Sequence, residues 1–361
     1  MTIELYVIDQ NGENIISRNG LAHITPEFNQ IYQNHFLNYS SQGSRYTAVG
    51  EEGRMIVIAY GDFMNTMQPF VEWKNMRGIP TTMVNVSTIG STSTAIKSYI
   101  QNEYDAGGLA YVLLVGDNAQ IPTNSGSGLG GPSDVAYSYL AGGDHYPDIF
   151  VGRFSAENVG HAATQVTRTL NYEKNPQLTS DDWYTTCLGI ASDQGPGDDN
   201  EYDYQHIRGQ QTDLMAYTYT KNPELFDGSQ GGNDASGNPT ASMVSTEVND
   251  GSGIIVYTGH GSNNSWGTTG FSNTNVGQLT NQDKLPFIWS VACVNGEFMN
   301  STCFAESWLR AEKNGQPTGA VAFLGSTINQ SWNPPMCGQD EMVDILVESY
   351  NDNIKRTFGG L

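Results

Sequence analysis

The sequence predicts an α/β fold of two βα units in series, with mostly parallel sheets. Short, nearly continuous apolar runs alternate with stretches of helical period over most of the 361 residues. Such runs are typical of parallel strands that helices cover on both faces. A polar stretch at 173–182, which contains Pro176, breaks this alternation, so we place the boundary between the two units there.

The individual elements follow from the local pattern. The apolar runs have the length of single strands, and in chain order the expected strands are Met55–Tyr60, Thr82–Val86, Tyr111–Asp117, Ile149–Phe154, Cys187–Ser192, Gly253–Thr258, Phe287–Cys293 and Ala320–Gly325. Between them apolar residues recur at helical spacing, so helices are expected near 65–77, 92–106, 157–174, 203–218, 240–250, 303–314 and 338–350. Residues 1–45 have weak periodicity and read as a leader.

The charge balance excludes some classes of partner. The chain has 38 acidic and 16 basic residues, which gives a net charge of −22. Nucleic acids and anionic membrane surfaces are bound through basic faces, so neither is expected here, whereas cationic substrates and divalent cations are favoured. No apolar run approaches the roughly 18 residues of a membrane span. The first twenty residues contain acidic side chains and are no signal peptide, so we expect either a cytoplasmic protein or one whose leader has been removed.

Two expected strands end next to reactive side chains. The run at 254–258 is followed by His260 between two glycines, and the run at 287–292 is followed by Cys293. Ligands bind at the carboxyl ends of the strands in open α/β sheets, so both side chains are expected at one edge of the sheet. A cysteine and a histidine are the groups that nucleophilic acyl transfer needs. A cysteine that ends an apolar strand is also commonly a small buried hydrophobe, so the residues alone leave both interpretations open.

The segments Tyr257–Ser262 and Ser290–Gly296 resemble the catalytic core of gingipains, the caspase-like cysteine peptidases of family C25. The resemblance continues through 53–58, 70–75, 111–117, 303–306, 317–319, 326–332, 338–342 and 353–360. It covers residues 46–361 and is closest to the arginine-specific type. It implies a caspase-like three-layer fold of two tandem subdomains, 46–180 and 181–361, in a secreted cysteine endopeptidase that cleaves after arginine.

The resemblance also implies roles in catalysis. Cys293 would be the nucleophile that forms a thioester, and His260 would protonate the departing amine. The backbone N–H groups of Gly261 and Cys293 would form the oxyanion hole. Where the arginine-specific gingipains have a glutamate that orients the histidine, this sequence has Gln194, with Asp193 beside it. A shift of the loop by one residue would let Asp193 supply the carboxylate, and an exposed loop acid is the alternative.

The resemblance further implies a pocket for an arginine side chain. Asp203 matches the aspartate that binds this side chain, and a carboxylate holds a planar guanidinium through two hydrogen bonds, which an ammonium cannot match. The matching pocket walls are Thr258, Val291, Trp332 and Met336. Without the resemblance, Asp203 reads as an acid that the dipole at a helix N-terminus favours.

Structural calcium is the expected cofactor. The resemblance implies one set of ligands made of the carboxylates of Asp117, Asp144 and Asp148 with the carbonyl groups of Ala141 and Tyr146. It suggests a second set made of Glu201, His206, Glu306 and Asp340. Oxygen ligands from several loops suit Ca²⁺.

The leader and the end of the chain carry the remaining expectations. Ser44–Thr47 resembles the junction between a gingipain prodomain and its mature enzyme, so cleavage after Arg45 would be self-processing, with the chain's own prodomain as a partner. Related enzymes continue past the position of Leu361, which is consistent with a fragment. Two alternatives stay open: a lysine-specific peptidase of the same family, and an inactive calcium-binding homologue or adhesin, which Gln194 favours.

Overall fold

The computed structural model describes residues 48–124, 130–177, 182–351 and 353–361. Among the described residues, those at 49–349 and 355–361 belong to one compact unit, which carries both large sheets. The expected leader and its cleavage position at Arg45 lie outside the described residues. Within the described ranges, no helix combines the length and the apolar character that crossing a bilayer requires.

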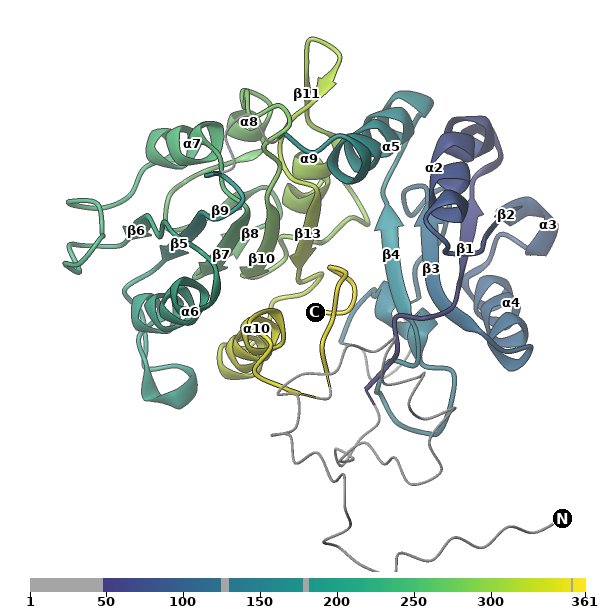
Figure 1. The fold of residues 1–361 in the computed structure, drawn as a ribbon, viewed down its shortest axis with the longest axis horizontal. Coiled ribbons are helices and arrows are strands. Elements are labelled where there is room, and N and C mark those ends of the chain that lie inside the picture. The colour runs from purple at the N-terminus through teal and green to yellow at the C-terminus, as the bar shows by residue number, and fades with distance from the viewer. Residues whose placement is uncertain (1–47, 125–129, 178–181, 352) are drawn as a thin grey trace, which may run out of the picture. The chain divides into compact units, whose positions relative to one another are not determined.

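The first half of the compact unit is a parallel sheet with the strand order β2-β1-β3-β4 (Figure 1). Its strands are β1 (Arg54–Ala59), β2 (Thr81–Asn85), β3 (Leu109–Val115) and β4 (Phe150–Phe154). Its helices are η1 (Gly61–Phe63), α2 (Met64–Met76), α3 (Val86–Ile89), α4 (Ser93–Asp105), η2 (Asp134–Ser138) and α5 (Val159–Lys174). Alternate residues of β1 face opposite sides, so Ile56 packs with α4 while Val57 packs with α2 and α5.

The second half is a parallel sheet with the strand order β13-β10-β7-β5-β6. Its strands are β5 (Cys187–Ala191), β6 (Glu224–Phe226), β7 (Ile254–Thr258), β10 (Phe287–Val291) and β13 (Ala322–Gly325). One face is covered by α6 (Asp203–Tyr217) and α10 (Asn333–Leu346), and the other by α7 (Ala241–Asp250), α8 (Asn273–Val276) and α9 (Phe304–Arg310) (Figure 1). Smaller elements are η3 (Asp198–Asn200) and two hairpins, β8 (Gly261–Ser262) with β9 (Ser265–Trp266), and β11 (Glu312–Lys313) with β12 (Gln316–Pro317).

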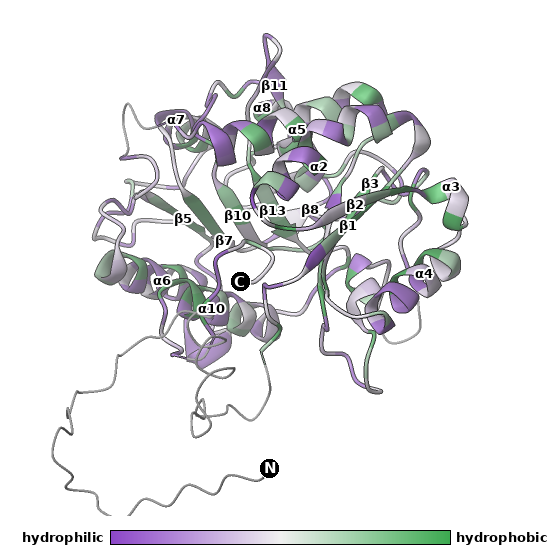
Figure 2. Ribbon diagram, turned by 45° about the vertical axis from the view of Figure 1, so that its right-hand side comes forward, coloured by the Kyte–Doolittle hydropathy of each residue, from purple (hydrophilic) through white to green (hydrophobic). Residues whose placement is uncertain are grey.

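The central strand β7 is buried along its whole length. Ile255 and Tyr257 join the cluster that contains Trp308 of α9, whereas Ile254 and Val256 join the cluster on the side of α6 and α10. Figure 2 shows this pattern as apolar strands between helices whose outer faces are polar. A strand that is apolar on both sides is the expected signature of a sheet between two helical layers.

The predicted fold class is confirmed, since both sheets are parallel and helices cover both faces. Every predicted strand lies within two residues of an observed one. The helix expected at 303–314 ends at Arg310, because Asn314 and Gly315 both have positive φ and turn a hairpin there. The helix expected at 338–350 spans 333–346 instead, because prolines are tolerated in the first helical turn.

Arg310, the last residue of α9, joins the two halves. Its side chain is 5% exposed, and Nη2 lies 2.6 Å from Glu306 Oε1 and 3.3 Å from Asp117 Oδ2, just after β3. Nη1 lies 2.8 Å from Glu157 Oε1. On α5, the buried Arg168 donates to the carbonyl groups that follow α9. Two guanidinium groups thus connect the four-stranded half to α9 of the other half.

Replacing Arg310 with methionine tests this connection. Arg310→Met leaves Glu306 and Asp117 without their cation, and breaking a buried ion pair in this way costs about 3–5 kcal/mol. We expect the free energy of unfolding in urea to fall by about that amount. Lys221→Met is the matched control, because the pair of Lys221 with Asp182 is exposed and should leave the midpoint unchanged. Equal effects of the two substitutions would show that the Arg310 cluster does not hold the halves together.

Candidate active site

The pairing of β7 with β10 brings the predicted catalytic residues to one edge of the second sheet. The two strands run parallel, and Val291 lies opposite Thr258 in their register. His260 follows Thr258 by two residues, and Cys293 follows Val291 by two residues. Both therefore leave the sheet at its carboxyl edge from adjacent strands, where open α/β sheets bind ligands.

The loops that carry these two residues are in contact. A Cβ atom added to Gly261 would lie 2.9 Å from the carbonyl oxygen of Cys293 and 2.8 Å from Cβ of Ala292. Real Cβ atoms essentially never approach backbone so closely, so only glycine fits here. The N–H groups of Gly261 and Cys293, which the sequence predicts as oxyanion donors, are therefore carried by touching segments of backbone.

Cys293 lies in a constrained turn. Its thiol is free and partly buried, and Sγ is 3.8 Å from the carbonyl oxygen of Gln330. The next residue, Val294, has φ of 50°, a strained conformation for a β-branched side chain, and its N–H donates to Ile328 O at 3.0 Å. The N–H of Cys293 itself has no partner in the part of the chain that the structure describes, so it is available to an oxyanion.

His260 is fixed at both its backbone and its ring. Its carbonyl oxygen accepts hydrogen bonds from the Tyr257 hydroxyl at 2.5 Å and from the Gly267 N–H at 2.7 Å. Its Nε2 lies 3.0 Å from Oε1 of Gln194, and its ring meets the Trp332 ring edge to face at 5.1 Å. Because an amide oxygen only accepts, we assign the proton to Nε2, which leaves Nδ1 to exchange a proton.

Gln194 takes the orienting position for which Asp193 was expected. The Ser192 hydroxyl binds the Asp203 carboxylate and also accepts from the Gln194 N–H at 3.3 Å. The Gln194 carbonyl accepts from the Asp203 N–H at 2.8 Å. These contacts fix the loop so that Gln194 points at His260, while Asp193 is exposed and makes no hydrogen bond to a described residue. The expected one-residue shift does not occur.

Asp203 is the first residue of α6 and is completely buried. Its Oδ1 accepts from the Trp332 indole N–H at 2.6 Å, and its Oδ2 accepts from the Ser192 hydroxyl. Burial raises the pKa of the Asp203 carboxyl above its ordinary value, against the smaller opposing effect of these two hydrogen bonds. No lysine or arginine within the described ranges pairs with it. Asp203 is thus a buried acid with hydrogen bonds but without a cation.

Among the predicted pocket walls, Trp332 contacts this carboxylate directly. Trp332 contacts both Asp203 and His260, and Thr258 and Val291 are paired neighbours on β7 and β10. A Cβ atom on Gly197 would lie 2.6 Å from Sδ of Met336 and 3.1 Å from Trp332, so the loop before α6 packs tightly on both side chains. The structure therefore brings all the predicted pocket residues together, beside His260.

The first predicted calcium set is not assembled. Asp117 faces Arg310 at 3.3 Å, while Oδ2 of Asp148 accepts from the N–H of Ala141 at 2.8 Å. Oδ1 of Asp144 accepts from the N–H of Tyr146 at 3.1 Å. In the ranges that the structure describes, no three His, Cys, Asp or Glu side chains group in a way that could hold a metal ion. In this arrangement the three carboxylates bind Arg310 or backbone N–H groups, and calcium binding at these residues stays a prediction.

The second set is divided between two places. Glu306 binds Arg310, whereas Nδ1 of His206 lies 3.4 Å from Asp340 Oδ1 and 4.0 Å from Glu201 Oε2. Burial, with nearby acidic side chains as a smaller cause, raises the pKa of Asp340 to about 6. Burial also lowers the pKa of His206. A histidine with two carboxylates is a poorer match to Ca²⁺ than an all-oxygen site.

The other cysteines differ from Cys293 in their surroundings. Cys187 and Cys303 are buried, and burial raises the pKa of both thiols, that of Cys187 to about 12. Cys337 is exposed, and its pKa is raised too, first by desolvation and then by the acidic residues nearby. Only the thiolate is a nucleophile, so these three cysteines are poor candidates for catalysis.

Sequence reasoning missed three buried polar residues near the site. Ser192 holds the Asp203 carboxylate. Gln339 of α10 accepts from the Thr258 hydroxyl at 2.8 Å and donates to carbonyl groups of β7 and β10. Asn295 joins the loops of Cys293 and His260. Asn295 lies inside a motif that the sequence singles out, but nothing in the pattern reveals which way its side chain points.

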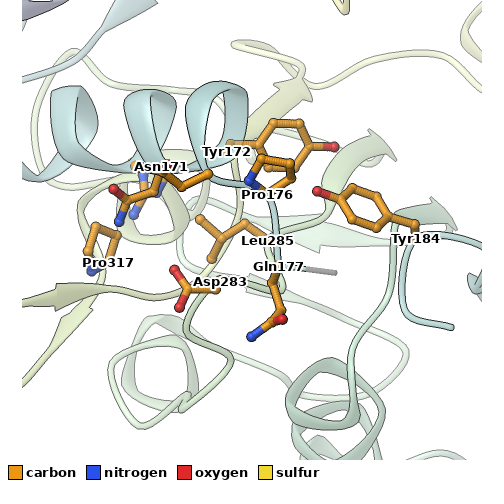
Figure 3. A pocket seen from close by; sticks show the side chains of 10 residues that line it. Asn171, Tyr172, Pro176, Gln177, Tyr184, Asp283, Leu285 and Pro317 are labelled. Atoms are coloured by element: carbon orange, nitrogen blue, oxygen red, sulfur yellow. The ribbon is translucent and has the colours of Figure 1, made fainter. Parts of the chain in front are cut away.

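Two cavities lie apart from these residues. One of about 10 Å³, lined by residues including Arg168, Tyr172 and Asp283, has room for a single water (Figure 3). The other, of about 490 Å³, is lined by residues that include Thr186 and Gly251, just before β5 and β7. The larger cavity therefore lies at the amino ends of the strands, opposite the edge where α/β sheets bind their ligands.

Comparison with known proteins places the chain in a family. Residues 49–361 match the family described as peptidase family C25. Gingipain R1 of Porphyromonas gingivalis is 43% identical over 370 residues, which cover 100% of this chain and 36% of that protein. Gingipain R2 of strain ATCC 33277 is 45% identical over 343 residues, covering 92% and 45%. Lys-gingipain of the same strain is 28% identical over 323 residues, covering 86% and 18%. The chain spans less than half the length of these relatives.

Solved structures agree with these matches. A crystal structure of the Arg-specific cysteine proteinase gingipain R (RGPB) has a TM-score of 0.82 at 44% identity, covering 87% of this chain and 72% of that one. A complex of the RgpB pro- and mature domains of Porphyromonas gingivalis has a TM-score of 0.80 at 45% identity, covering 85% and 72%. The resemblance seen in the sequence motifs is thereby confirmed, and the chain belongs to peptidase family C25.

Proposed function

We propose that this chain is a cysteine endopeptidase that cleaves peptide bonds after arginine. The observation that carries the proposal is the buried Asp203 carboxylate, which pairs with no lysine or arginine in the described part of the chain. Trp332 contacts both this carboxylate and the ring of His260. An uncompensated buried charge is costly, so its presence at a strand edge beside a cysteine and a histidine indicates a ligand that brings the opposite charge. The names of the gingipain R relatives support the same specificity.

The carboxylate of Asp203 suits a guanidinium in particular. Each oxygen accepts one hydrogen bond, from Trp332 and from Ser192, and a carboxylate has about four lone-pair sites in all. One acceptor site therefore remains on each oxygen. Two parallel N–H donors of a planar guanidinium can use both sites together, whereas the ammonium of lysine is a point charge.

The chemistry follows from the groups around Cys293. Its thiol gives a proton to Nδ1 of His260, and the thiolate attacks the carbonyl carbon of the substrate's arginine. The N–H groups of Cys293 and Gly261 stabilise the oxyanion that forms. His260 gives its proton to the departing amine as the C–N bond breaks, which leaves a thioester on Cys293. A water that loses its proton to His260 then attacks the thioester, which releases the new carboxyl end and restores the thiol.

Two alternatives make different demands on the same site. A lysine-specific peptidase, like the Lys-gingipain relatives, would need a site shaped for an ammonium, and the two free acceptor positions of Asp203 favour a planar donor instead. An inactive homologue would be favoured by the neutral Gln194. The Gln194 amide still holds the ring of His260, so Gln194 is compatible with an active enzyme as well. The reactivity of Cys293 distinguishes the two cases.

The remaining parts of the proposal rest on the relatives. A prodomain that binds this chain, self-processing after Arg45 and a secreted or cell-surface location are supported by the likeness to a complex of pro- and mature domains and to gingipains. Structural calcium is proposed on the resemblance alone, and no catalytic step depends on it.

The first test compares two substrates. We expect the protein with a thiol reductant to hydrolyse a fluorogenic peptide amide that ends in arginine at least about 100-fold faster than the lysine analogue. The lysine ammonium keeps the charge but cannot make two parallel hydrogen bonds, and a hydrogen bond to a charged group contributes about 1.5–3 kcal/mol. Cys293→Ala should abolish turnover, and Asp203→Asn should remove the preference for arginine. A preference for lysine would overturn the role of Asp203, and full activity of Cys293→Ala would exclude the proposed nucleophile.

The second test separates Gln194 from Asp193. Gln194→Ala removes the hydrogen bond that fixes the His260 ring, so we expect kcat to fall about 10- to 100-fold. Asp193→Ala changes an exposed side chain without hydrogen bonds and should leave kcat unchanged. Steady-state kinetics with the arginine peptide give both values. The opposite ranking would show that Asp193 moves to His260 when substrate binds.

The third test follows the charge of Asp203 with pH. Because its pKa is raised in the free protein, acidification should protonate Asp203 at a pH where an ordinary aspartate is still ionised. Binding of benzamidine, a planar cation, to Cys293→Ala should therefore weaken as the pH falls through this raised pKa. Calorimetric titration measures the affinity. If the affinity for benzamidine stays constant down to the pH at which ordinary carboxylates are protonated, the pKa of Asp203 is not raised, and this account of its burial is wrong.

A further inference from the structure

We propose that Asn295 is a positioning residue that holds the loop after His260 against the loop of Cys293. The inference rests on the proposed peptidase function, since it concerns the relative placement of the two groups that carry it. Asn295 follows Cys293 by two residues, yet its side chain is directed to the other loop. It does not touch the reacting atoms, so its effect on the reaction is indirect.

The direct link is a set of three hydrogen bonds. The Asn295 side chain is completely buried, and its Nδ2 donates to the carbonyl oxygen of Ser262 at 2.7 Å and to that of Ser265 at 3.2 Å. Its Oδ1 accepts from the Ser290 hydroxyl at 2.9 Å. One amide thus binds both strands of the β8–β9 hairpin and the end of β10. Every side-chain hydrogen-bonding group of this asparagine has a partner.

A second chain of contacts reaches His260 itself. The Ser290 hydroxyl that donates to Asn295 also accepts from the Trp266 indole N–H at 2.9 Å. The Trp266 ring stacks on Tyr257, with the ring centres 4.8 Å apart, and the Tyr257 hydroxyl donates to the carbonyl oxygen of His260 at 2.5 Å. The network therefore runs from the turn after the nucleophile to the backbone of the base.

Asparagine is well suited to this position. Two N–H donors are needed for two backbone carbonyl groups, and one acceptor is needed for the Ser290 hydroxyl. An aspartate has no donor when ionised, and an aliphatic residue would leave all three groups unsatisfied. The site is also tight, since a Cβ on Gly261 would lie 2.9 Å from Nδ2 of Asn295. A satisfied polar network in a packed site fixes one arrangement of the loops.

The chain contains a matched control. Asn281 is 1% exposed and also joins two segments, with Nδ2 donating to Gly319 O at 2.8 Å and to Lys284 O at 3.0 Å, and with Oδ1 accepting from Gly319 N–H at 2.9 Å. Its partners precede β10 and β13, so they lie at the amino ends of these strands. Asn281 therefore has the same burial and bonding as Asn295 but no contact with either catalytic loop.

The experiment compares Asn295→Ala with Asn281→Ala in the full chain. We measure kcat and KM for the arginine peptide, and we count active sites by the alkylation of Cys293 in peptide maps. Asn295→Ala should lower kcat about 100-fold with KM changed by less than about twofold, because a shift of about 1 Å between reacting groups costs this much. Asn281→Ala should lower the unfolding temperature by a similar amount and leave kcat within about twofold. Equal kcat values for the two variants would overturn the proposal.

Two further measurements keep the inference testable if Asn295→Ala folds poorly or if the wild-type protein cleaves no peptide. Ser290→Ala is milder, and it should lower kcat in the same direction. Hydrogen exchange reads the link without any turnover: exchange of the amides in 259–266 should rise in Asn295→Ala and Ser290→Ala and stay unchanged in Asn281→Ala. A wild-type protein without turnover would refute the peptidase function alone, whereas unchanged exchange at 259–266 would refute the link.

Discussion

The parallel pairing of β7 with β10 is the constraint on which the site depends. It sets Val291 opposite Thr258, and these two predicted pocket walls are the last paired positions before the loops of Cys293 and His260. Because side chains alternate along a strand, a slip of one residue would move the large Tyr257 side chain to the face of α6 and α10, and it would separate the two loops. The helical layers on both faces hold this register, since Ile255 and Val256 are buried on opposite sides.

Buried charge is treated in two opposite ways in this fold. Around Arg310 opposite charges are paired, because the carboxylates of Glu306, Asp117 and Glu157 all contact its guanidinium. At Asp203 a carboxylate is completely buried, and its hydrogen-bond donors among the described residues are the neutral side chains of Trp332 and Ser192. The Arg310 cluster joins the two halves of the molecule. At Asp203, the two hydrogen bonds are what compensates for the desolvation of the carboxylate. A cationic side chain of a substrate would pair with the Asp203 carboxylate, as Arg310 pairs with carboxylates within the chain.

Local patterns predict the strands well, because a strand buried on both faces needs a continuous apolar run, as at 254–258. They fail where the outcome depends on contacts between distant residues. The short strand β6 has too few residues to show a pattern. The helix expected at 303–314 includes Asn314, which in the structure forms a turn with Gly315. Gln194 faces His260 because Ser192 and Asp203 fix the loop. The resemblance places Gln194 at this position, but it leaves open whether Gln194 or Asp193 reaches the histidine. Likewise, a carboxylate such as Asp117 reads equally as a metal ligand or as a partner of Arg310.

The proposed specificity depends most on the binding of the substrate's guanidinium by the Asp203 carboxylate. A crystal structure of Cys293→Ala with a bound peptide that contains one arginine tests it directly. We predict that the guanidinium donates to both oxygens of Asp203, with Trp332 against its face and the scissile carbonyl beside the N–H groups of Gly261 and residue 293. A peptide bound with its arginine in solvent, and with Asp203 still enclosed by Ser192 and Trp332 alone, would contradict the account.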